Sequence, residues 1–310
     1  METGKPPHIG YPAVGRFGLA HSMLAWARCH VWCARNGFEM LAPNWRHLRI
    51  GPYLRREIDK RAYHRLFTFP DYITGIRREF LLATLPKVYA GSADLDSVCE
   101  GNGRKLIVFQ NLVSGNEERY FGEIVGLEKQ VRGALVRMTK PRYLPCVGSE
   151  AHIAIHIRMG DFSERATADA LRQGAKNSRI AVKWYADILK ELRRRLGVMV
   201  PARLYSDGPD HELSPILELD WVRQAPLAPA VTDLLSISAA KLLISSGSGF
   251  SFWGAYLGHV PRINFPGQRM YRVLGGQGDL DLEPECESVA ELSDAFLQHL
   301  HSLFSTPRNK

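Results

Sequence analysis

From residue 151 onward, short apolar runs alternate along the chain with segments whose apolar residues recur every three or four positions. The short runs predict buried strands, and the helical spacing predicts helices that cover them. The expected strands span 151–158, 202–206, 221–224, 242–245 and 260–265, and the expected helices span 181–196, 211–219, 231–240 and 250–257. Because repeated strand–helix–strand units cross over with one hand, this half predicts a parallel, doubly wound α/β sheet.

The first half opens with the same order of elements. An apolar run, a loop with two glycines, a segment of helical spacing and a second apolar run follow one another at 9–14, 15–18, 19–35 and 38–41. Asn36-Gly37 supplies a stop for the helix. Further on we expect a strand over 105–110 and a helix over 123–136, whereas residues 46–104 show no sustained period.

The stretch between the two halves, residues 141–149, contains two prolines and a glycine and is typical of a linker. With 310 residues, the chain is long enough for two hydrophobic cores of about 150 residues each. We therefore expect two α/β domains, an N-terminal one over 1–150 and a C-terminal one over 151–310.

The chain is basic, with a net charge of +8 and an isoelectric point near 9.3. Such a charge suits three kinds of partner, namely nucleic acid, an anionic membrane surface and a ligand that carries phosphate. The basic clusters lack the interleaved aromatic residues of a single-strand platform, and Arg193-Arg194-Arg195 is typical of the solvated side of a helix. Charge alone does not choose among the three partners.

Five scattered cysteines are an odd number, which favours reduced thiols over a disulfide framework. Cys29 and Cys33 lie one helical turn apart beside His30, but no second ligand cluster at zinc-finger spacing accompanies them, so we expect buried thiols. No apolar run approaches the roughly 20 residues that span a bilayer, and the first residues lack the layout of a secretory signal. We expect a cytoplasmic protein, with peripheral contact to the inner face of an anionic membrane as an open possibility.

Candidate chemistry is expected where strands end, because ligands of open parallel sheets bind beyond the carboxyl ends of the strands. The first such place is HIAIHIRMGD, residues 152–161. Side chains alternate along a strand, so three isoleucines share one face, while His156 and Arg158 share the other at the crevice end. A guanidinium on a covered strand needs a partner, so we favour a functional Arg158 over an exposed edge strand with incidental charges.

The second place is SSGSGFSFWGAYLG, residues 245–258. Serines and glycines fill the turn between an expected strand and an expected helix, where free backbone N–H groups and the positive helix end attract phosphate. The segment lacks the lysine of a P-loop and does not follow the dinucleotide-binding pattern. The alternative is an ordinary strand–helix connection whose aromatic residues pack into the core, and both can hold at once.

Two further loops follow expected strands. Tyr205-Ser206-Asp207-Gly208 places a carboxylate where it can accept hydrogen bonds from a ribose or from guanine, or can cap the helix near His211. The two interpretations of Asp207 are about even. The loop Gly15-Arg16-Phe17-Gly18 begins a helix and is as consistent with a tight turn as with a ligand contact.

Together, HIRMGD, the GRFG loop with its helix, YSDG and the run from Asp233 through ISSGSGFSFWGAYLG resemble the alpha-1,2-fucosyltransferase family, glycosyltransferase family 11. The family occurs in bacteria and animals, in a superfamily with alpha-1,6- and protein O-fucosyltransferases. The resemblance covers the second half of the chain and the start of the first. It implies a GT-B fold, in which two Rossmann-like domains face a central cleft, the N-terminal one on the acceptor side and the C-terminal one binding the GDP-sugar.

The resemblance also implies GDP-fucose as donor, inversion at the sugar carbon, and no metal or other cofactor. Carried over by residue, Arg158 would grip the donor diphosphate, His156 would lie on the nucleoside side and Asp207 would contact guanine. The phosphates would be bound by the loop that contains Ser246, Ser248, Gly249, Phe250 and Ser251.

On the acceptor side, the resemblance points to the loop Gly15, Arg16, Phe17 and Gly18. The family usually continues this loop with Asn-Gln, whereas this chain has Leu19-Ala20. This departure takes away the support of these two positions for the family's acceptor contacts, and with them for the linkage. The expected acceptor is a glycan or glycolipid hydroxyl, with an alpha-1,2 bond to galactose as the family's reaction.

Displacement of GDP from a sugar passes through an oxocarbenium-like state, so the enzyme must stabilise charge on the leaving diphosphate and align an acceptor hydroxyl opposite it. Arg158 and the helix that starts near Phe250 meet the first need without a metal. No Asp-x-Asp pair ends an expected strand. Asp161 and Glu164 are the nearby carboxylates that could act as general base, and the sequence does not choose between them.

Two alternatives to a fucosyltransferase stay open. One is a transferase of the same fold that moves another nucleotide sugar. The other is a non-catalytic nucleotide- or nucleic-acid-binding protein, which would bind with steep salt dependence and show no turnover. The polar residues at the strand ends favour an enzyme, and we expect no nucleic-acid partner.

Overall fold

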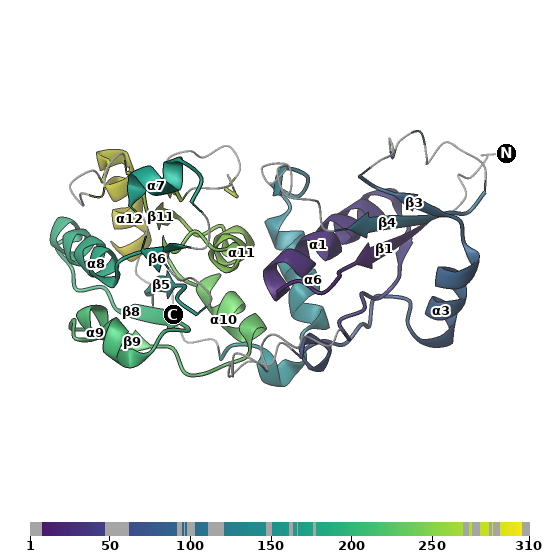
Figure 1. Cartoon of the computed structure of the whole chain (residues 1–310), viewed down its shortest axis with the longest axis horizontal. Coiled ribbons are helices and arrows are strands. Elements are labelled where there is room, and N and C mark those ends of the chain that lie inside the picture. The colour runs from purple at the N-terminus through teal and green to yellow at the C-terminus, as the bar shows by residue number, and fades with distance from the viewer. Residues whose placement is uncertain are drawn as a thin grey trace. The chain divides into compact units, whose positions relative to one another are not determined.

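The computed structural model describes most of the chain (Figure 1). The described residues are 8–46, 62–91, 95, 97, 103–110, 121–146, 151–160, 164–165, 167–175, 178–268, 273–274, 280–284, 287 and 292–305, with only the backbone of 164–165. The chain forms two compact units, unit 1 with residues 1–144 and 229–231, and unit 2 with residues 145–228 and 232–310. Each unit is built on a parallel sheet, which confirms the expected α/β fold class.

The main sheet of unit 1 has four parallel strands in the order β2-β1-β4-β3. They are β1 (Ile9–Ala13), β2 (Glu39–Met40), β3 (Lys87–Tyr89) and β4 (Leu106–Gln110). The described helices are α1 (Leu19–Asn36), α3 (Gly75–Thr84) and α6 (Glu128–Met138), with the short 3₁₀ turns η1 (Tyr63–Arg65) and η2 (Pro141–Tyr143). The structure thus contains the early strand–helix–strand order expected from sequence, and it adds β3 and α3, which the sequence pattern did not predict.

A glycine at position 10 lets helix α1 lie close to strand β1. A Cβ atom at Gly10 would overlap the sulfur atoms of Cys29 and Cys33, which lie one turn apart on α1. Both cysteines are buried free thiols, as expected. Burial, and then the neighbouring Cys33, raise the pKa of the Cys29 thiol well above its ordinary value, which favours the protonated thiol.

The main sheet of unit 2 has six parallel strands in the order β12-β11-β10-β5-β8-β9. They are β5 (Ile153–Ile157), β8 (Ala202–Ser206), β9 (Val222–Gln224), β10 (Leu242–Ser245), β11 (Arg262–Asn264) and β12 (Asp281–Leu282). Read from β9, the strands follow the chain order third, second, first, fourth, fifth, sixth, which is the Rossmann order. The winding direction therefore reverses between β5 and β10.

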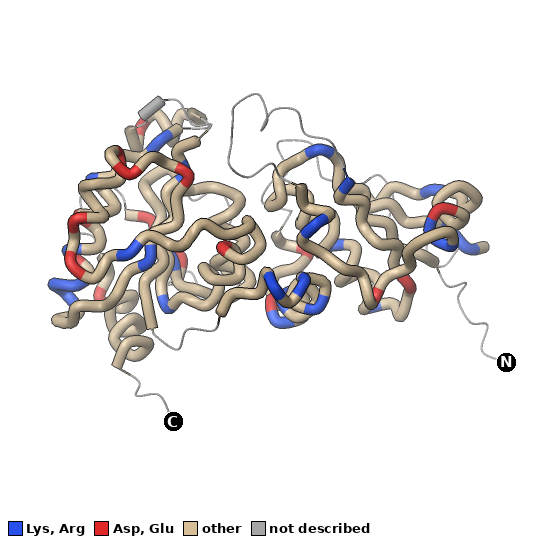
Figure 2. The backbone as a smooth tube through the Cα atoms, turned by 90° about the horizontal axis from the view of Figure 1, so that it is seen from below, with Lys and Arg blue, Asp and Glu red and all other residues tan. Residues whose placement is uncertain are grey.

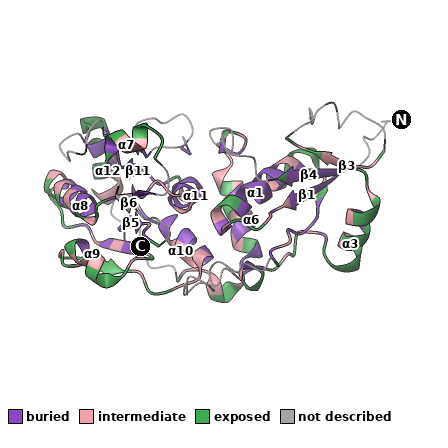
Figure 3. Ribbon diagram, viewed as in Figure 1, coloured by how far each residue is buried: buried purple, intermediate pink, exposed green. Residues whose placement is uncertain are grey.

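Helices cover both faces of this sheet (Figure 1). The helices α8 (Val182–Leu196), α9 (Asp210–Leu217) and α12 (Asp294–Ser305) lie on one side, and α10 (Ala230–Ile237) and α11 (Gly249–Gly258) lie on the other. The three isoleucines of β5 point into the core formed with α8, α9 and α12, and Figure 3 shows this interior as buried. A small separate pair, β6 (Glu164–Arg165) and β7 (Ser178–Arg179), flanks the short helix α7 (Ala168–Arg172). None of the described helices is long and apolar enough to span a bilayer.

The arginine run at the end of α8 is only partly solvated, which corrects the sequence interpretation. Arg194 is exposed, but Arg193 is buried and donates hydrogen bonds to the carbonyl oxygens of Val200 (2.8 and 3.1 Å) and Asp220 (2.7 Å). Arg193 therefore ties the loops that precede β8 and β9 to the helix. Burial lowers its pKa from the ordinary value, and the carbonyl acceptors compensate the buried charge.

A fully buried ion pair fixes the β11–β12 edge of unit 2. Arg262 donates from Nε and Nη2 to the two carboxylate oxygens of Asp281 at 2.7 and 2.8 Å, and Asn264 donates to Asp281 Oδ1 at 2.7 Å. The Arg262 guanidinium also lies 4.8 Å from the ring centre of Phe252 on α11. Since an ion in a low-dielectric interior is costly unless it is paired, removal of either partner takes from the other the charge that this ion pair supplies.

We predict that Asp281→Asn lowers the free energy of unfolding by about 3–5 kcal/mol, because the buried guanidinium of Arg262 then loses the carboxylate that accepts two of its hydrogen bonds. Asp294→Asn is the matched control, since this carboxylate pairs with Arg195 at 3.0 Å while 89% exposed. Its loss should cost less than about 1 kcal/mol. Urea unfolding at pH 7 measures both variants, and equal losses would contradict the importance of the buried pair.

Candidate functional site

The carboxyl end of β5 places His156 and Arg158 at the point where the winding of the sheet reverses. All five residues of β5 are buried, and its isoleucines face the core. His156 therefore projects from the opposite face, where it is only 7% exposed. Arg158 directly follows the strand and keeps about a quarter of its side chain (27%) accessible. The alternation expected from sequence is confirmed for His156.

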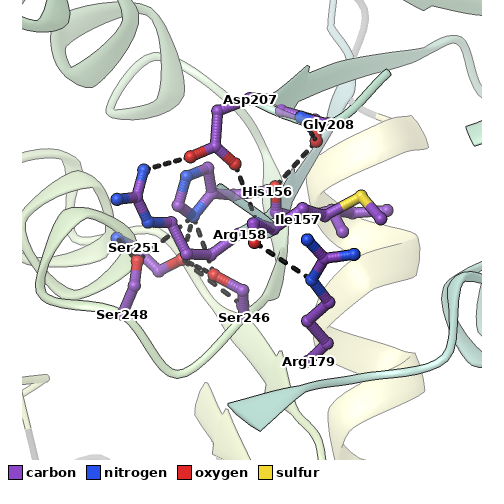
Figure 4. Close-up of polar contacts among 11 residues, drawn as sticks. His156, Ile157, Arg158, Arg179, Asp207, Gly208, Ser246, Ser248 and Ser251 are labelled. Carbon is purple, nitrogen blue, oxygen red and sulfur yellow. Dashed lines mark hydrogen bonds and ion pairs between the residues drawn. The ribbon is translucent and has the colours of Figure 1, made fainter. Parts of the chain in front are cut away.

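Three serine hydroxyls lie close to one ring nitrogen of His156 (Figure 4). Its Nδ1 lies 2.7 Å from Ser251 Oγ, 2.9 Å from Ser246 Oγ and 3.3 Å from Ser248 Oγ. Because a hydroxyl both donates and accepts, these serines satisfy Nδ1 in either tautomer of the neutral ring. The ring of Phe250 packs beside the imidazole at 5.2 Å between centres. His156 thus links β5 to the loop after β10.

The imidazole of His156 is neutral at physiological pH. Burial lowers its pKa from the ordinary 6.5 to about 4; the carboxylate of Asp207 opposes this shift and the charge of Arg158 adds to it. His156 therefore contributes hydrogen-bonding capacity and shape to the site, and no positive charge.

The same serine loop builds the N-terminus of helix α11. Ser248 is the N-cap residue, and its side chain accepts a hydrogen bond from the backbone N–H of Ser251. Gly247 adopts a left-handed conformation at φ 60°, and a Cβ atom there would overlap Gln268. The positive end of a ten-residue helix is thereby held at the carboxyl end of β10, an arrangement that suits an anion.

Asp207, at the end of β8, holds the arginine and its loop. Its carboxylate pairs with Arg158 Nη1, and Oδ1 accepts a hydrogen bond from the backbone N–H of Met159 at 2.8 Å. Burial alone would raise the pKa of Asp207, but Arg158 and the backbone N–H groups of Met159 and Gly160 bring it below its ordinary value, so the carboxylate is ionised. A Cβ atom at Gly160 would overlap the carboxylate. Helix α9 has no side-chain cap, so the capping role considered for Asp207 is wrong.

The structure brings together most of the expected donor residues of unit 2. His156, Ser246, Ser248, Phe250 and Ser251 form one cluster, Gly249 opens α11, and Arg158 and Asp207 form a pair beside them. Asp161 lies outside the described residues. Glu164 lies in β6, and its side chain is likewise outside the described part. The candidate general base therefore stays a prediction.

Sequence inspection missed Arg179, which supports the same loop from the other side. Its Nε donates to the carbonyl oxygen of Met159 at 3.0 Å, and its Nη1 pairs with Glu212 on α9 at 3.1 Å. Arg179 belongs to the two-residue strand β7, which is too short to give a periodic signal. Asp207 and Arg179 thus fix the backbone of Met159 through its N–H and its carbonyl respectively.

The expected acceptor loop lies in unit 1, between β1 and α1. Gly15 adopts φ 55°, and Gly18 is the N-cap residue of α1. Arg16 is exposed, and the exposed ring of Phe17 stacks on His21 at 6.1 Å. Ser22 Oγ on α1 donates to the carbonyl oxygens of Val14 and Phe17. These hydrogen bonds hold the backbone of the loop against the helix. The loop is a tight turn with two accessible side chains.

Within the described residues, no group of three or more metal-ligating side chains comes together. The sequence contains Asp279-Leu280-Asp281, but Asp281 begins β12 and both of its carboxylate oxygens are bound by Arg262. That carboxylate therefore stabilises the fold through its ion pair with Arg262.

No protein-family model and no curated protein sequence matches the chain. Among solved structures, it is similar to the fucosyltransferase NodZ from Bradyrhizobium, with 13% identity over 84% of this chain and 94% of that one and a TM-score of 0.45. It is also similar to a mutant of Arabidopsis thaliana FUT1 in complex with GDP, at 12% identity over 84% and 71% of the two chains and a TM-score of 0.48. E. coli heptosyltransferase WaaC with ADP matches at 11% identity over 96% and 99%, with a TM-score of 0.45. The resemblance to the alpha-1,2-fucosyltransferase family stays a prediction.

We predict that His156 makes the protein less stable in acid. The unfolded chain takes up a proton near pH 6.5 and the folded ring only near pH 4, so stability is lost as the pH falls through this window. Between pH 7 and pH 5 the loss from this residue amounts to about 2 kcal/mol. Urea unfolding at both pH values should show a smaller loss for His156→Gln than for the parent.

His211→Gln, at an exposed histidine of α9, is the control and should keep the parent's pH dependence. If His156→Gln also keeps the parent's full loss, the buried imidazole is not the group that is being titrated.

Proposed function

We propose that the chain is a glycosyltransferase that binds a nucleoside diphosphate sugar at the carboxyl ends of β5, β8 and β10. One observation carries the proposal: Arg158 and the N-terminus of α11 flank the point where the winding of the unit 2 sheet reverses. Open parallel sheets bind ligands at this position. A guanidinium and a helix N-terminus are together the donors that a diphosphate needs.

Arg158 supplies the charge for the leaving group in this proposal. The guanidinium is held by Asp207 and stays partly accessible, so it is oriented before the ligand arrives. Preorganised donors stabilise developing charge without reorganisation at the moment of bond cleavage. Because His156 is neutral, the proposed donors to the diphosphate are the guanidinium of Arg158, whose charge Asp207 partly balances, and the N-terminus of α11.

The hydroxyl cluster around His156 is proposed to position the phosphates. Ser248 and Ser251 are already committed to the helix start and to the imidazole, so a phosphate would meet fixed donors at the beginning of α11. Substitution of His156 would release three hydroxyls at once. His156 is accordingly a positioning residue.

At the finer level, we propose GDP-fucose as donor and a glycan hydroxyl as acceptor, with inversion at the sugar carbon. The donor identity rests on the resemblance of HIRMGD and of the serine loop to fucosyltransferases. In this scheme Asp161 or Glu164 takes the proton from the acceptor hydroxyl, and the loop Gly15–Gly18 lies on the acceptor side. Asp207 is proposed to act through Arg158, because its observed contacts go to that side chain and to the loop that follows it.

A panel of GDP- and UDP-sugars tests the proposal. Each donor is incubated with the protein and with galactose-terminated acceptors, once without EDTA and once in excess EDTA. The released nucleotide is measured in both samples. We expect turnover with GDP-fucose and none with UDP-sugars, and we expect EDTA to leave it unchanged because Arg158 and α11 take the place of a metal. Release from another nucleotide sugar would favour the alternative donor. Tight nucleotide binding without release would favour a non-catalytic binder, and loss in EDTA with rescue by Mg²⁺ or Mn²⁺ would contradict the metal-free site.

We predict that Arg158→Lys lowers turnover about 100- to 1000-fold, the scale on which loss of one preorganised donor acts. The lysine keeps one positive charge but loses the planar fork that Asp207 orients. The fold should persist, because the core face of β5 is untouched. Turnover and thermal melting are measured on the same purified variant.

Arg223→Lys, on the exposed edge strand β9, is the matched control and should leave turnover unchanged. If Arg158→Lys has the melting temperature and the turnover rate of the parent, the assignment of Arg158 to the diphosphate is contradicted.

A further inference from the structure

The positive charge of the chain belongs to unit 1. Residues 1–144 contain 22 lysines and arginines against 13 aspartates and glutamates, a net charge of +9. Residues 145–310 contain 18 basic and 19 acidic residues, a net charge of −1. Figure 2 marks the charged positions of the described chain. The nucleotide site proposed in unit 2 therefore does not account for the basic character of the protein.

Helix α3 of unit 1 carries two large apolar side chains on its solvent side. Ile76 is 90% exposed and Phe80 is 63% exposed. At about 100° per residue, positions four apart differ by only about 40° around the helix, so the two side chains form one ridge. Figure 3 shows α3 largely as exposed.

The opposite side of α3 is already used by the fold. Leu81 is buried in the core cluster with Ile9, Leu41 and Ile73, and Leu82 and Leu85 pack against it. The helix therefore cannot rotate to bury Ile76 and Phe80 without exposing its leucines. The ridge is held outside by the packing of unit 1.

Charges of both signs lie around the ridge, and Glu79, next to Phe80, pairs with Arg78 on the same helix. Arg77, next to Ile76, pairs with Glu39, and Arg104 reaches the same carboxylate at 3.2 Å. Lys87 and Tyr89, on the strand after α3, are exposed. A pocket of about 530 Å³ opens beside Arg77, lined also by His30, Tyr72 and Arg137. Arg137 pairs with Asp71 at 2.8 Å, so the pocket's arginines are both neutralised, and the attraction for an anion comes from the unit as a whole.

We infer that unit 1 docks on an anionic lipid bilayer through the Ile76–Phe80 ridge of α3. An interfacial helix buries its apolar side chains at the boundary of headgroups and acyl chains, and basic residues near the surface add electrostatic attraction to anionic lipid. A nucleic acid would use the charge of unit 1 but would have no use for an exposed isoleucine. The inference does not depend on the proposed transferase activity.

Vesicle flotation with the full chain tests this inference. One vesicle sample is phosphatidylcholine alone, and the other contains 30% phosphatidylglycerol. We expect binding to the anionic vesicles only, weakened in 0.5 M NaCl because the attraction is screened. Ile76→Glu/Phe80→Glu should lower the partition coefficient at least about 10-fold, since it removes the ridge and adds two negative charges.

Val198→Glu/Met199→Glu is the matched control, because these residues are half-exposed apolar side chains of unit 2. It adds the same two charges and should leave vesicle binding unchanged. Ile76→Ala/Phe80→Ala removes the ridge without changing charge, and it should also weaken binding. Thermal melting of all variants should equal that of the parent.

Four results would overturn the inference. Three of them are equal vesicle binding by the parent and by Ile76→Glu/Phe80→Glu, equal binding to neutral and anionic vesicles, and no vesicle binding combined with tight binding of a labelled 20-nucleotide RNA. A shift of the parent from dimer to monomer on substitution of the ridge, without vesicle binding by either, would assign the ridge to a second copy of the chain and would also overturn it.

Discussion

The reversal of winding between β5 and β10 is the constraint on which the site depends. Six parallel strands direct their carboxyl ends to one edge, and the chain leaves β5 for α8 on one face but leaves β10 for α11 on the other. The connections diverge there, so nothing in the sheet itself covers the ends of these two strands. His156 and its serines join strand β5 to the connection that follows β10, and Asp207 and Arg179 fix the loop after β5. The order of the strands thus determines where the candidate site lies, and the side chains at the strand ends determine its chemistry.

Much of unit 2 could be predicted from its sequence, because buried parallel strands and amphipathic helices leave strong periodic signals. The alternation of isoleucines with His156 and Arg158 is enough to indicate the two faces of β5. The contacts of those side chains could not be predicted in the same way. That His156 meets Ser246 and Ser251, and that Arg158 meets Asp207, depends on β10 and β8 being the neighbours of β5. Strand order is a tertiary property that local periodicity does not encode.

Unit 1 was harder to predict for an identifiable reason. Helix α3 has apolar residues on its solvent side as well as on its core side, so its pattern shows no single apolar face. The strands β2 and β3 are two and three residues long, too short for alternation to be visible. The solvated face predicted for the arginine run of α8 was partly wrong for a different reason. A charged run usually indicates a solvated face, but Arg193 is turned inward by carbonyl acceptors that lie in later parts of the chain.

The buried pair of Arg262 and Asp281 has a consequence for how the sheet of unit 2 terminates. Strand β12 is two residues long, and its few backbone hydrogen bonds alone would hold its alignment weakly. A slip by one residue would turn Asp281 away from the guanidinium, and the cost of a buried, unmatched ion would then oppose the slip. The ion pair therefore fixes the register of β12 against β11. Without β12, the backbone of β11 would be exposed at the edge of the sheet and could pair with strands of other molecules.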